Sequence, residues 1–263
     1  MAFGLKDLIG CLESGDNLDI GYHRVFGGQI LAQMIVAAAN ASPDKVVKSI
    51  NVLFPREGDT SKRMEYGVNK LQDGRTFGTT SIIATQDDKV ISAATISMHA
   101  AEESALHRSA APPSVGSPED GTPTENVMMP FDIRVVDGVD LADRGVGPAT
   151  YQMWLRADVG DAPLATHQAL LAHATDLTII GTALRPFEGV SQADSTVTLH
   201  TAVTSHSLWF HQPVDLNAWV LLSQESPVVA NARAFGRGDV FNAAGEVVAS
   251  YAQESMIRSI TPQ

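Results

Sequence analysis

Two segments of the chain are apolar at nearly every position, and each is long enough to form a helix. Residues 28–39 read GQILAQMIVAAA and residues 163–175 read PLATHQALLAHAT. A helix that is apolar all round is buried on every side, so this pattern predicts two buried helices. The polar residues of the first segment, Gln29 and Gln33, are four positions apart and therefore lie on one face. Pro163 suits the first turn of the second helix.

Segments rich in β-branched residues predict strands before and after the second of these helices. The expected strands cover residues 49–54 and 64–71, a hairpin at 77–98, then 131–136, 149–156, 197–211, 217–223 and a second hairpin at 235–256. The order of buried helix, two strands and hairpin therefore occurs twice along the chain. A buried helix beside antiparallel strands predicts a sheet that curls around it.

The two predicted hairpins are similar in sequence. FGTTSIIATQDDKVISAATISM at residues 77–98 and FGRGDVFNAAGEVVASYAQESM at residues 235–256 both begin with Phe-Gly and end with Ser-Met, at an offset of 158. An internal repeat of this kind predicts two similar units that pack on each other. At this offset Gln253 in the second copy aligns with Thr95 in the first.

Residues 101–127 differ in composition from both halves. They are rich in Pro, Ser, Gly and acidic residues and contain few large apolar ones, which is typical of a surface linker. We therefore expect an N-terminal unit at residues 1–100, a linker at 101–127 and a C-terminal unit at 128–263.

Charge and cysteine content narrow the class of protein. The formal net charge is −12 and the pI is about 5.0, which argues against a general nucleic-acid binder, because such a protein needs a basic face. Cys11 is the only cysteine, so no disulfide can form within the chain, which fits a reducing compartment. The chain has no signal-peptide pattern and no run of about 18 apolar residues. We expect a cytoplasmic protein without a membrane span.

Asp176 is a candidate for chemistry because its neighbours in LLAHATDLTII are mostly apolar. A carboxylate in such surroundings is costly unless it has hydrogen-bond partners. The first helix, in contrast, has no acidic residue between Arg24 and Pro43. Asp also favours turns and helix ends, so a purely structural role for Asp176 stays open.

Gln253 is the second candidate, in the predicted strand VVASYAQES. By alternation its side chain shares a mostly apolar face with Tyr251, where an amide suits a contact with a ligand or a water. A glutamine at the edge of the core, bonded to backbone, is the alternative.

The other chemistry-bearing residues form no familiar motif. His206 and His211 are five residues apart on a strand and so face opposite sides, and His167 and His173 have no Cys or acidic partners at ligand spacing. We therefore expect no metal site. The chain has no G-x-S-x-G motif and no P-loop, so nothing indicates a serine nucleophile or a nucleotide.

Several separated stretches resemble the type II acyl-CoA thioesterases. They occur in the family's order over about residues 22–258 and read VFGGQ, SINVLFPREGD, LQDGRTFG, HATDLTII, HSLWFHQPVDLNAWVLLSQESP, ARAFGRGDVF and VVASYAQE. The resemblance implies an α+β fold, the double hot-dog, in which antiparallel sheets wrap around long central helices. It also implies hydrolysis of acyl-CoA thioesters to free acid and CoA by direct attack of water.

The family holds and activates this water with an Asp, a Thr or Ser, and a Gln. Asp176 matches the acid, which would act as general base, and Gln253 matches the glutamine, which would orient the water. The hydroxyl position falls on Val203, which cannot hydrogen-bond a water. Thr201 and Ser205 share the face of Val203, and Thr204 would take the position only if the alignment slipped by one.

The resemblance also bears on cofactors and partners. The mechanism requires no covalent nucleophile and no cofactor. The partners expected are an acyl-CoA substrate and, by analogy with other hot-dog proteins, further copies of the chain in a homo-oligomer. The anionic end of CoA needs cations, and candidates in the first half are Lys48, Arg56, Lys62, Arg63 and Arg75.

Two other functions remain open. Val203 favours a non-catalytic acyl-CoA or lipid-binding protein that kept the fold. A hot-dog hydratase is the third reading, because such enzymes pair an acid with a histidine, and His173 lies three residues before Asp176 on the predicted helix.

Overall fold

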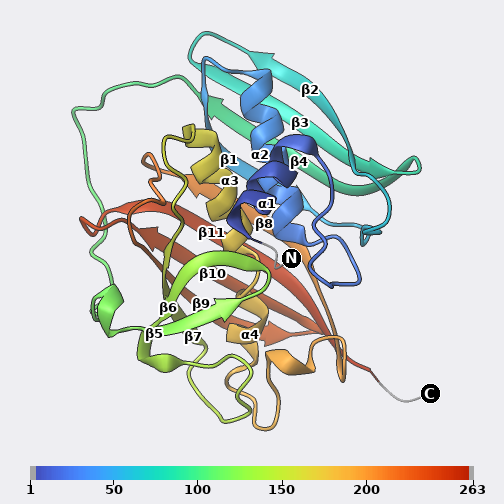
Figure 1. Ribbon diagram of the computed structural model, residues 1–263, viewed down its shortest axis with the longest axis vertical. Helices are drawn as coiled ribbons and strands as arrows, with labels where there is room; N and C mark the ends of the chain where they lie inside the picture. The colour runs from blue at the N-terminus through green and yellow to red at the C-terminus, as the bar shows by residue number, and fades with distance from the viewer. Residues whose placement is uncertain (1–3, 261–263) are drawn as a thin grey trace.

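The computed structural model describes residues 4–260, in which eleven strands form one antiparallel sheet with helices packed against it (Figure 1). The helical elements are α1 (Leu5–Ser14), α2 (Gly27–Ala41), η1 (Pro118–Asp120), η2 (Val136–Gly138), α3 (Leu164–Thr175), α4 (Ile179–Leu184) and η3 (Gln192–Asp194), where η denotes a 3₁₀ turn. The strands are β1 (Val46–Leu53), β2 (Glu65–Asp73), β3 (Phe77–Gln86), β4 (Lys89–His99), β5 (Thr122–Asn126), β6 (Met129–Val135), β7 (Thr150–Arg156), β8 (Leu199–Phe210), β9 (Val220–Ala230), β10 (Arg233–Phe241) and β11 (Val247–Ser259).

The sheet is built from two copies of one strand arrangement. Its order is β2-β3-β4-β1-β8-β11-β10-β9-β7-β6-β5, so the sequence β1-β4-β3-β2 in the first half matches β8-β11-β10-β9 in the second. The halves join where β1 pairs antiparallel with β8, around the pair Asn51 and Ser207. On either side of it Ile50 pairs with Leu208 and Val52 with His206. This register relates the two halves by an approximate two-fold axis.

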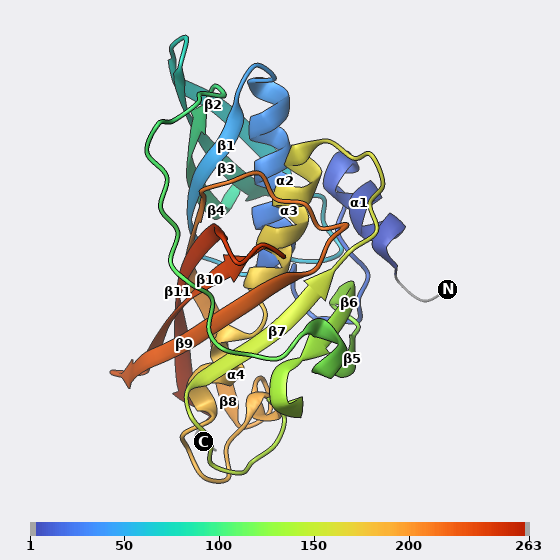
Figure 2. The same ribbon diagram turned by 90° about the vertical axis from the view of Figure 1, so that its left-hand side faces the viewer.

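Three strands have no counterpart in the first half. Strands β5, β6 and β7 extend the sheet beyond β9, at the end of the sheet opposite β2 (Figure 2). The corresponding edge of the first half is β2, most of whose residues are exposed. Residues 101–117, the first part of the expected linker, form no helix or strand. Strand β5 lies in the last part of that linker. The extra strands make the C-terminal half the larger one.

The two helices predicted to be buried lie side by side on one face of the sheet (Figure 2). No residue of α2 up to position 39 is exposed, and every residue of α3 from Thr166 to Thr175 is buried, which confirms the apolar pattern. Fully buried side chains such as Ile30 and Leu31 each contribute about 1.5–3 kcal/mol. With 15 and 12 residues these helices are of ordinary length, so the expected length of the central helices is not confirmed.

Local sequence explains how α2 ends and what its polar residues do. Pro43 disfavours the helical conformation in the residue before it, so α2 stops at Ala41 with Ser42 as its C-cap. Gln29 and Gln33 lie on one face, as predicted, and are hydrogen-bonded to each other at 3.2 Å. They also bind backbone groups of the segment that follows α1, so their role is to fasten that segment to the core.

Two β-bulges fix which residues of the halves correspond. In the hairpin pairs, Ile91 of β4 and Val248 of β11 are the extra residues, and they lie 157 positions apart. The offset of 158 taken from the sequence is therefore wrong by one on this strand. Buried Ile96, rather than exposed Thr95, is the counterpart of Gln253.

A second pair of bulges extends the correspondence to the neighbouring strands. Lys48 of β1 and Thr204 of β8 are the extra residues there. Counting from them, Ile50 corresponds to His206 and Val47 to Val203. The pair Ile50–Ile96 in the first half thus occupies the positions of His206–Gln253 in the second.

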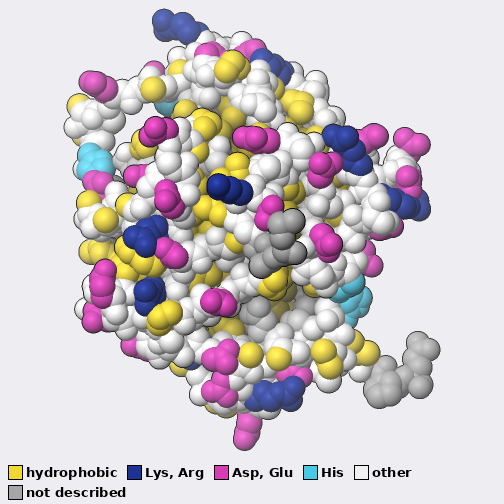
Figure 3. Space-filling view, in the orientation of Figure 1, with side chains coloured by type: hydrophobic (Ala, Val, Ile, Leu, Met, Phe, Trp, Pro, Cys, Tyr) yellow, Lys and Arg dark blue, Asp and Glu magenta, His cyan; other side chains and the backbone are white. Residues whose placement is uncertain are grey.

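Two features of the surface and the helices bear on possible partners. On the face shown in Figure 3 acidic and basic side chains are interspersed, so this face offers no broad basic surface for nucleic acid. Within residues 4–260 no helix is long and apolar enough to cross a membrane.

Candidate active site

Asp176 is placed by two helix ends. It is the C-cap of α3, and its carboxylate lies against the first turn of the antiparallel neighbour α2. Only glycine fits there, because a Cβ on Gly27 would lie 2.7 Å from Oδ2 of Asp176. A Cβ on Gly28 would lie 2.6 Å from the carbonyl oxygen of His173. The Gly-Gly pair therefore allows α2 to start in direct contact with the acid.

The surroundings of Asp176 change its acidity. The residue is 3% exposed, and burial raises the pKa of its carboxyl to about 7, although a hydrogen bond from the Gly28 backbone N–H acts in the opposite direction. Its Oδ1 atom is buried and has no hydrogen-bond partner among the described residues. A carboxylate that titrates near neutrality and has a free oxygen is suited to accept a proton.

His206 lies between the two predicted site residues. Its Nδ1 atom is 3.8 Å from Oδ1 of Asp176 and 3.0 Å from Oε1 of Gln253, and its Nε2 atom is 3.1 Å from the Thr175 hydroxyl. Burial lowers the pKa of His206 to about 4. Between pH 4 and 7 the acid therefore keeps its proton and the imidazole is neutral, so the two groups do not form an ion pair.

Gln253 is held firmly on β11. It is 1% exposed, its Oε1 contacts His206, and its Nε2 donates to the Ser255 hydroxyl at 3.0 Å. A carboxamide has two lone pairs and two N–H groups, so one acceptor site and one donor remain. The structure brings Asp176 and Gln253 together through His206 and not by direct contact.

A cavity of about 500 Å³ opens beside Asp176. Its walls are largely apolar, which suits a hydrocarbon chain. The apolar residues that line it are Val25, Phe26, Ile30, Phe54, Met128, Leu177, Ile180, Val203 and Met256. Thr201 and Thr204 also line it, but the Thr204 hydroxyl donates to the carbonyl oxygen of Glu254 at 3.0 Å. Val203 thus faces the same cavity as the acid.

Basic side chains are present at this cavity. Arg24, Arg56 and His200 line it, and Arg24 is partly neutralised by Glu57 at 3.3 Å. Of the five cations proposed from the sequence, only Arg56 lines the cavity. Arg24, which those candidates omitted, is the second arginine.

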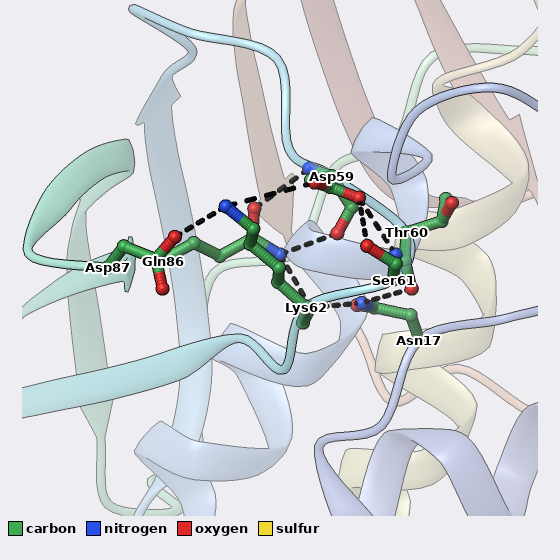
Figure 4. A network of polar contacts seen from close by, with 7 residues as sticks. All are labelled: Asn17, Asp59, Thr60, Ser61, Lys62, Gln86 and Asp87. Carbon is green, nitrogen blue, oxygen red and sulfur yellow. Dashed lines mark hydrogen bonds and ion pairs between the residues drawn. The ribbon is translucent and has the colours of Figure 1, made fainter.

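Lys62 illustrates why other cations are less suitable. Figure 4 shows it in a polar network with Asp59, Gln86 and Asp87, and its ammonium group is 2.5 Å from Asp87 and 3.9 Å from Asp59. Its backbone carbonyl accepts from Asn17 and Gln86. Lys62 therefore already has anionic partners and connects three loops.

The hydratase reading relied on His173, and that expectation is wrong. Its Nε2 atom lies 2.7 Å from the backbone carbonyl of Met128, and its ring packs edge-on against Phe26. It makes no hydrogen bond to Asp176. The histidine near the acid is His206, which we considered from the sequence only as a possible metal ligand. Its place depends on the pairing of β8 with β11, which sets His206 opposite Gln253.

Metal binding has no obvious site in the described part of the chain. Between residues 4 and 260 no three His, Cys, Asp or Glu side chains are grouped so that they could hold a metal ion. Asp176 has only His206 nearby as a second ligand type.

Sequence comparisons give the same family for both halves. The family model for the acyl-CoA thioesterase N-terminal domain matches residues 16–99, and that for the acyl-CoA thioesterase C-terminal domain matches residues 106–257. Acyl-CoA thioesterase 2 of Haemophilus influenzae is 33% identical over 93% of this chain and 91% of its own. Acyl-coenzyme A thioesterase 8 of Mus musculus is 28% identical over 91% of this chain and 82% of its own.

Solved structures agree with this result. A tesB protein of Mycobacterium avium subsp. paratuberculosis has a TM-score of 0.81 and 28% identity, covering 97% of this chain and 100% of that one. The acyl-CoA thioesterase II of Mycobacterium marinum has a TM-score of 0.77 and 28% identity, covering 94% and 93%. A protein of Alicyclobacillus acidocaldarius with the hot-dog fold has a TM-score of 0.72 at 18% identity, covering 92% of this chain and 89% of that one, which confirms the hot-dog fold expected from the sequence.

Proposed function

The chain belongs to the acyl-CoA thioesterase family, and we propose that it hydrolyses acyl-CoA at Asp176 with a single activated water. The reaction is hydrolysis of a thioester to a free acid and CoA. We propose which residues carry out this hydrolysis. The observation that supports it is the buried Asp176 carboxyl, whose Oδ1 has no hydrogen-bond partner within residues 4–260 and which borders a mostly apolar cavity.

In the proposed reaction Asp176 is the general base. Its carboxylate takes a proton from water as the water oxygen attacks the thioester carbonyl carbon. The resulting tetrahedral intermediate collapses, the carbon–sulfur bond breaks, and the proton on Asp176 passes to the departing thiolate. Oxygen from water ends in the carboxylic acid, and hydrogen ends on CoA.

The start of α2 supplies the electrostatic stabilisation. The first N–H groups of a helix have no partner inside it and carry the positive end of its dipole. Gly27 lines the cavity at this position, next to the acid. We assign its N–H to the oxygen that becomes negative in the intermediate. The Gly28 N–H is already directed to Asp176.

Gln253 and His206 have a positioning role in this proposal. The second N–H of Gln253, left over after its bond to Ser255, orients the attacking water. His206 holds the other end of the carboxamide and fills the space between it and the acid. His206 is neutral and, like Gln253, does not line the cavity, so neither side chain contacts the acyl chain.

The CoA end of the substrate is assigned to the cavity side that carries Arg24 and Arg56. Phosphate groups bind guanidinium groups well because the charges and the geometry are complementary. Arg56 is exposed and has one hydrogen bond, to the carbonyl of Val90. This leaves most of its donors available.

Asp176→Asn tests the proposal directly. The amide keeps the shape but cannot accept the proton, so release of free CoA thiol should fall by about 100-fold or more. The matched control is Asp158→Asn, an exposed acid outside the cavity, which should leave the rate unchanged. Equal rates for wild type and Asp176→Asn would contradict the assignment.

The two alternatives are distinguished in the same assay. A non-catalytic binding protein, suggested by Val203, would bind acyl-CoA without releasing thiol. A hydratase would add water to an enoyl-CoA, and the assay with that substrate detects it; neither His173 nor His206 lines the cavity, and His200, which does, is exposed.

Other expectations from the sequence stay proposals. We propose that α2 and α3 serve as the central helices of two hot-dog units, divided by a linker at residues 101–127. We also propose a cytoplasmic homo-oligomer. Light scattering of the purified chain tests the last point, since a monomer mass would contradict it.

A further inference from the structure

A second cavity lies next to the first, in a part of the molecule that only the C-terminal half contains. It measures about 550 Å³ and lies between strands β5–β7, the loop after η2, and η3. Its apolar lining residues are Met129, Ile133, Val139, Leu141, Tyr151 and Met153. No arginine or lysine lines it, so it does not suit phosphate groups.

One residue borders both cavities. Gln192 lines both of them, and adjacent chain positions border opposite sides, since Met128 lines the first cavity and Met129 the second. The Gln192 carboxamide oxygen packs so closely on α4 that a Cβ on Gly181 would lie 2.0 Å from it. Gly181 therefore provides the space in which this side chain lies.

The carboxamide of Gln192 is held only by packing. Its Oε1 is buried without a hydrogen-bond partner, and the side chain makes no hydrogen bond with any described residue. Its backbone, in contrast, is fixed: the N–H donates to the carbonyl of Leu141 at 2.9 Å, and neighbouring Asp194 accepts from Ser191 N–H and pairs with Arg144 at 2.8 Å. The side chain can therefore move aside without losing a hydrogen bond, while its loop stays in place.

We propose that long acyl chains pass Gln192 and end in the second cavity, so that Gln192 determines specificity for chain length. This rests on the proposed function, because the thioester must lie beside Asp176 for the chain to point this way. The substrate class is a long unbranched acyl-CoA, since flexible, buried Met129 and Met153 line the second cavity, whereas the carboxylates that also line it, Glu125 and Asp140, are exposed. A short acyl chain stays in the first cavity and does not reach Gln192.

The test compares butyryl-CoA and palmitoyl-CoA as substrates. Val139→Trp fills the second cavity from a half-buried position, and Val146→Trp places the same ring on an exposed position that lines neither cavity. We expect Val139→Trp to lower kcat/KM for palmitoyl-CoA about 10-fold or more, the scale for misfit in an apolar pocket, with butyryl-CoA changed less than about 2-fold. Gln192→Ala should raise the ratio of palmitoyl-CoA to butyryl-CoA turnover. Val146→Trp should change neither substrate.

Binding of palmitoyl-CoA to Asp176→Asn protein, with and without Val139→Trp, separates this inference from the proposed function. Weaker binding of palmitoyl-CoA by Asp176→Asn with Val139→Trp than by Asp176→Asn alone supports the role of the second cavity. If wild type releases no thiol, only the proposed hydrolysis is overturned. Conversely, if Val139→Trp and Gln192→Ala leave both the binding and the turnover of palmitoyl-CoA unchanged, this inference is overturned, whereas the proposed hydrolysis is not affected.

Discussion

The two halves of the sheet place different side chains at corresponding buried positions. In the N-terminal half Ile50 pairs with Ile96, and in the C-terminal half His206 pairs with Gln253. All four side chains are almost completely buried. Since the same backbone register accepts an apolar pair, the fold does not require the polar one. Burial of polar groups is costly unless they are bonded, so the polar pair is best explained by the site beside Asp176.

The residues that cap the C-terminal ends of α2 and α3 also differ, and again the C-terminal half carries the group suited to chemistry. Ser42 is the C-cap of α2, Asp176 is the C-cap of α3, and both are 3% exposed. Only the second is ionisable. At one position the halves agree, because Val203 corresponds to Val47. The C-terminal half has thus acquired an acid, a histidine and a glutamine, while the position expected to carry a hydroxyl is as apolar as in the N-terminal half.

The largest effect is expected from closing the space at the start of α2. Gly27→Ala places a methyl group 2.7 Å from Oδ2 of Asp176, so the carboxylate must move, and kcat/KM should fall on the order of 10²-fold. Gly10→Ala in α1, where an added Cβ meets nothing within 4 Å, is the control and should keep full activity. Circular dichroism of both variants checks that the fold persists.

The comparison of halves can be tested by making them alike. His206→Ile with Gln253→Ile turns the C-terminal pair into the N-terminal one, and activity should fall 10-fold or more because the water loses its orientation. Each single change leaves a buried partner unbonded, at a cost of about 1–3 kcal/mol in the free energy of unfolding.

The double variant should be more stable than the sum of the two single effects predicts, because it leaves no unpaired member of the couple. Urea unfolding of all four proteins measures this coupling. The control is Ile50→Val, at the N-terminal position that corresponds to His206. It removes one methylene and should lower the free energy of unfolding by about 0.5–1.5 kcal/mol while leaving activity unchanged. If the stability changes simply add, the polar pair is not a coupled unit.

A smaller effect concerns stability and pH. The folded pKa of Asp176, about 7, lies above its unfolded value, about 3.9, so the folded state holds this proton more tightly. Its contribution to stability is complete below pH 4 and is lost as pH rises through 7, by up to about 1.4 kcal/mol per pH unit.

Asp176→Asn removes this loss, so the stability gained by the variant over wild type should be larger at pH 8 than at pH 5. Both proteins keep His173 and His206, whose pKa values burial lowers to about 4, so their titration largely cancels in the comparison. If the free energies of unfolding of Asp176→Asn and wild type differ by the same amount at pH 5 and pH 8, burial does not raise the pKa of Asp176.

Local patterns were sufficient for much of the fold. The apolar runs predicted α2 and α3 to within about two residues, and β-branched content together with the internal repeat predicted both hairpins. The strand predicted at residues 217–223 is β9, which extends to Ala230, and α4 and β5 were not predicted. Helix α4 has only six residues, too short for a periodic signal, and β5 is mostly exposed and contains a proline.

The site was less predictable because its geometry depends on distant pairings. Asp176 was identifiable as an acid among apolar neighbours. The counterpart of Gln253 was misjudged because the Phe-Gly and Ser-Met matches give an offset of 158, whereas strand pairing, with a bulge at Ile91 and at Val248, gives 157 for β4 and β11. His206 comes to lie between Asp176 and Gln253 only once β8 and β11 pair next to α3. The second cavity depends in part on β5, a strand that the composition of the expected linker concealed.

The pH dependence of kcat/KM for one acyl-CoA tests the central claim most directly. If Asp176 is the base, kcat/KM rises about tenfold per pH unit below its pKa and levels off above a midpoint near 7. Asp176→Asn should show only a low residual rate without this midpoint. A wild-type profile that is flat between pH 5 and 8, or the same midpoint in Asp176→Asn, would contradict the account.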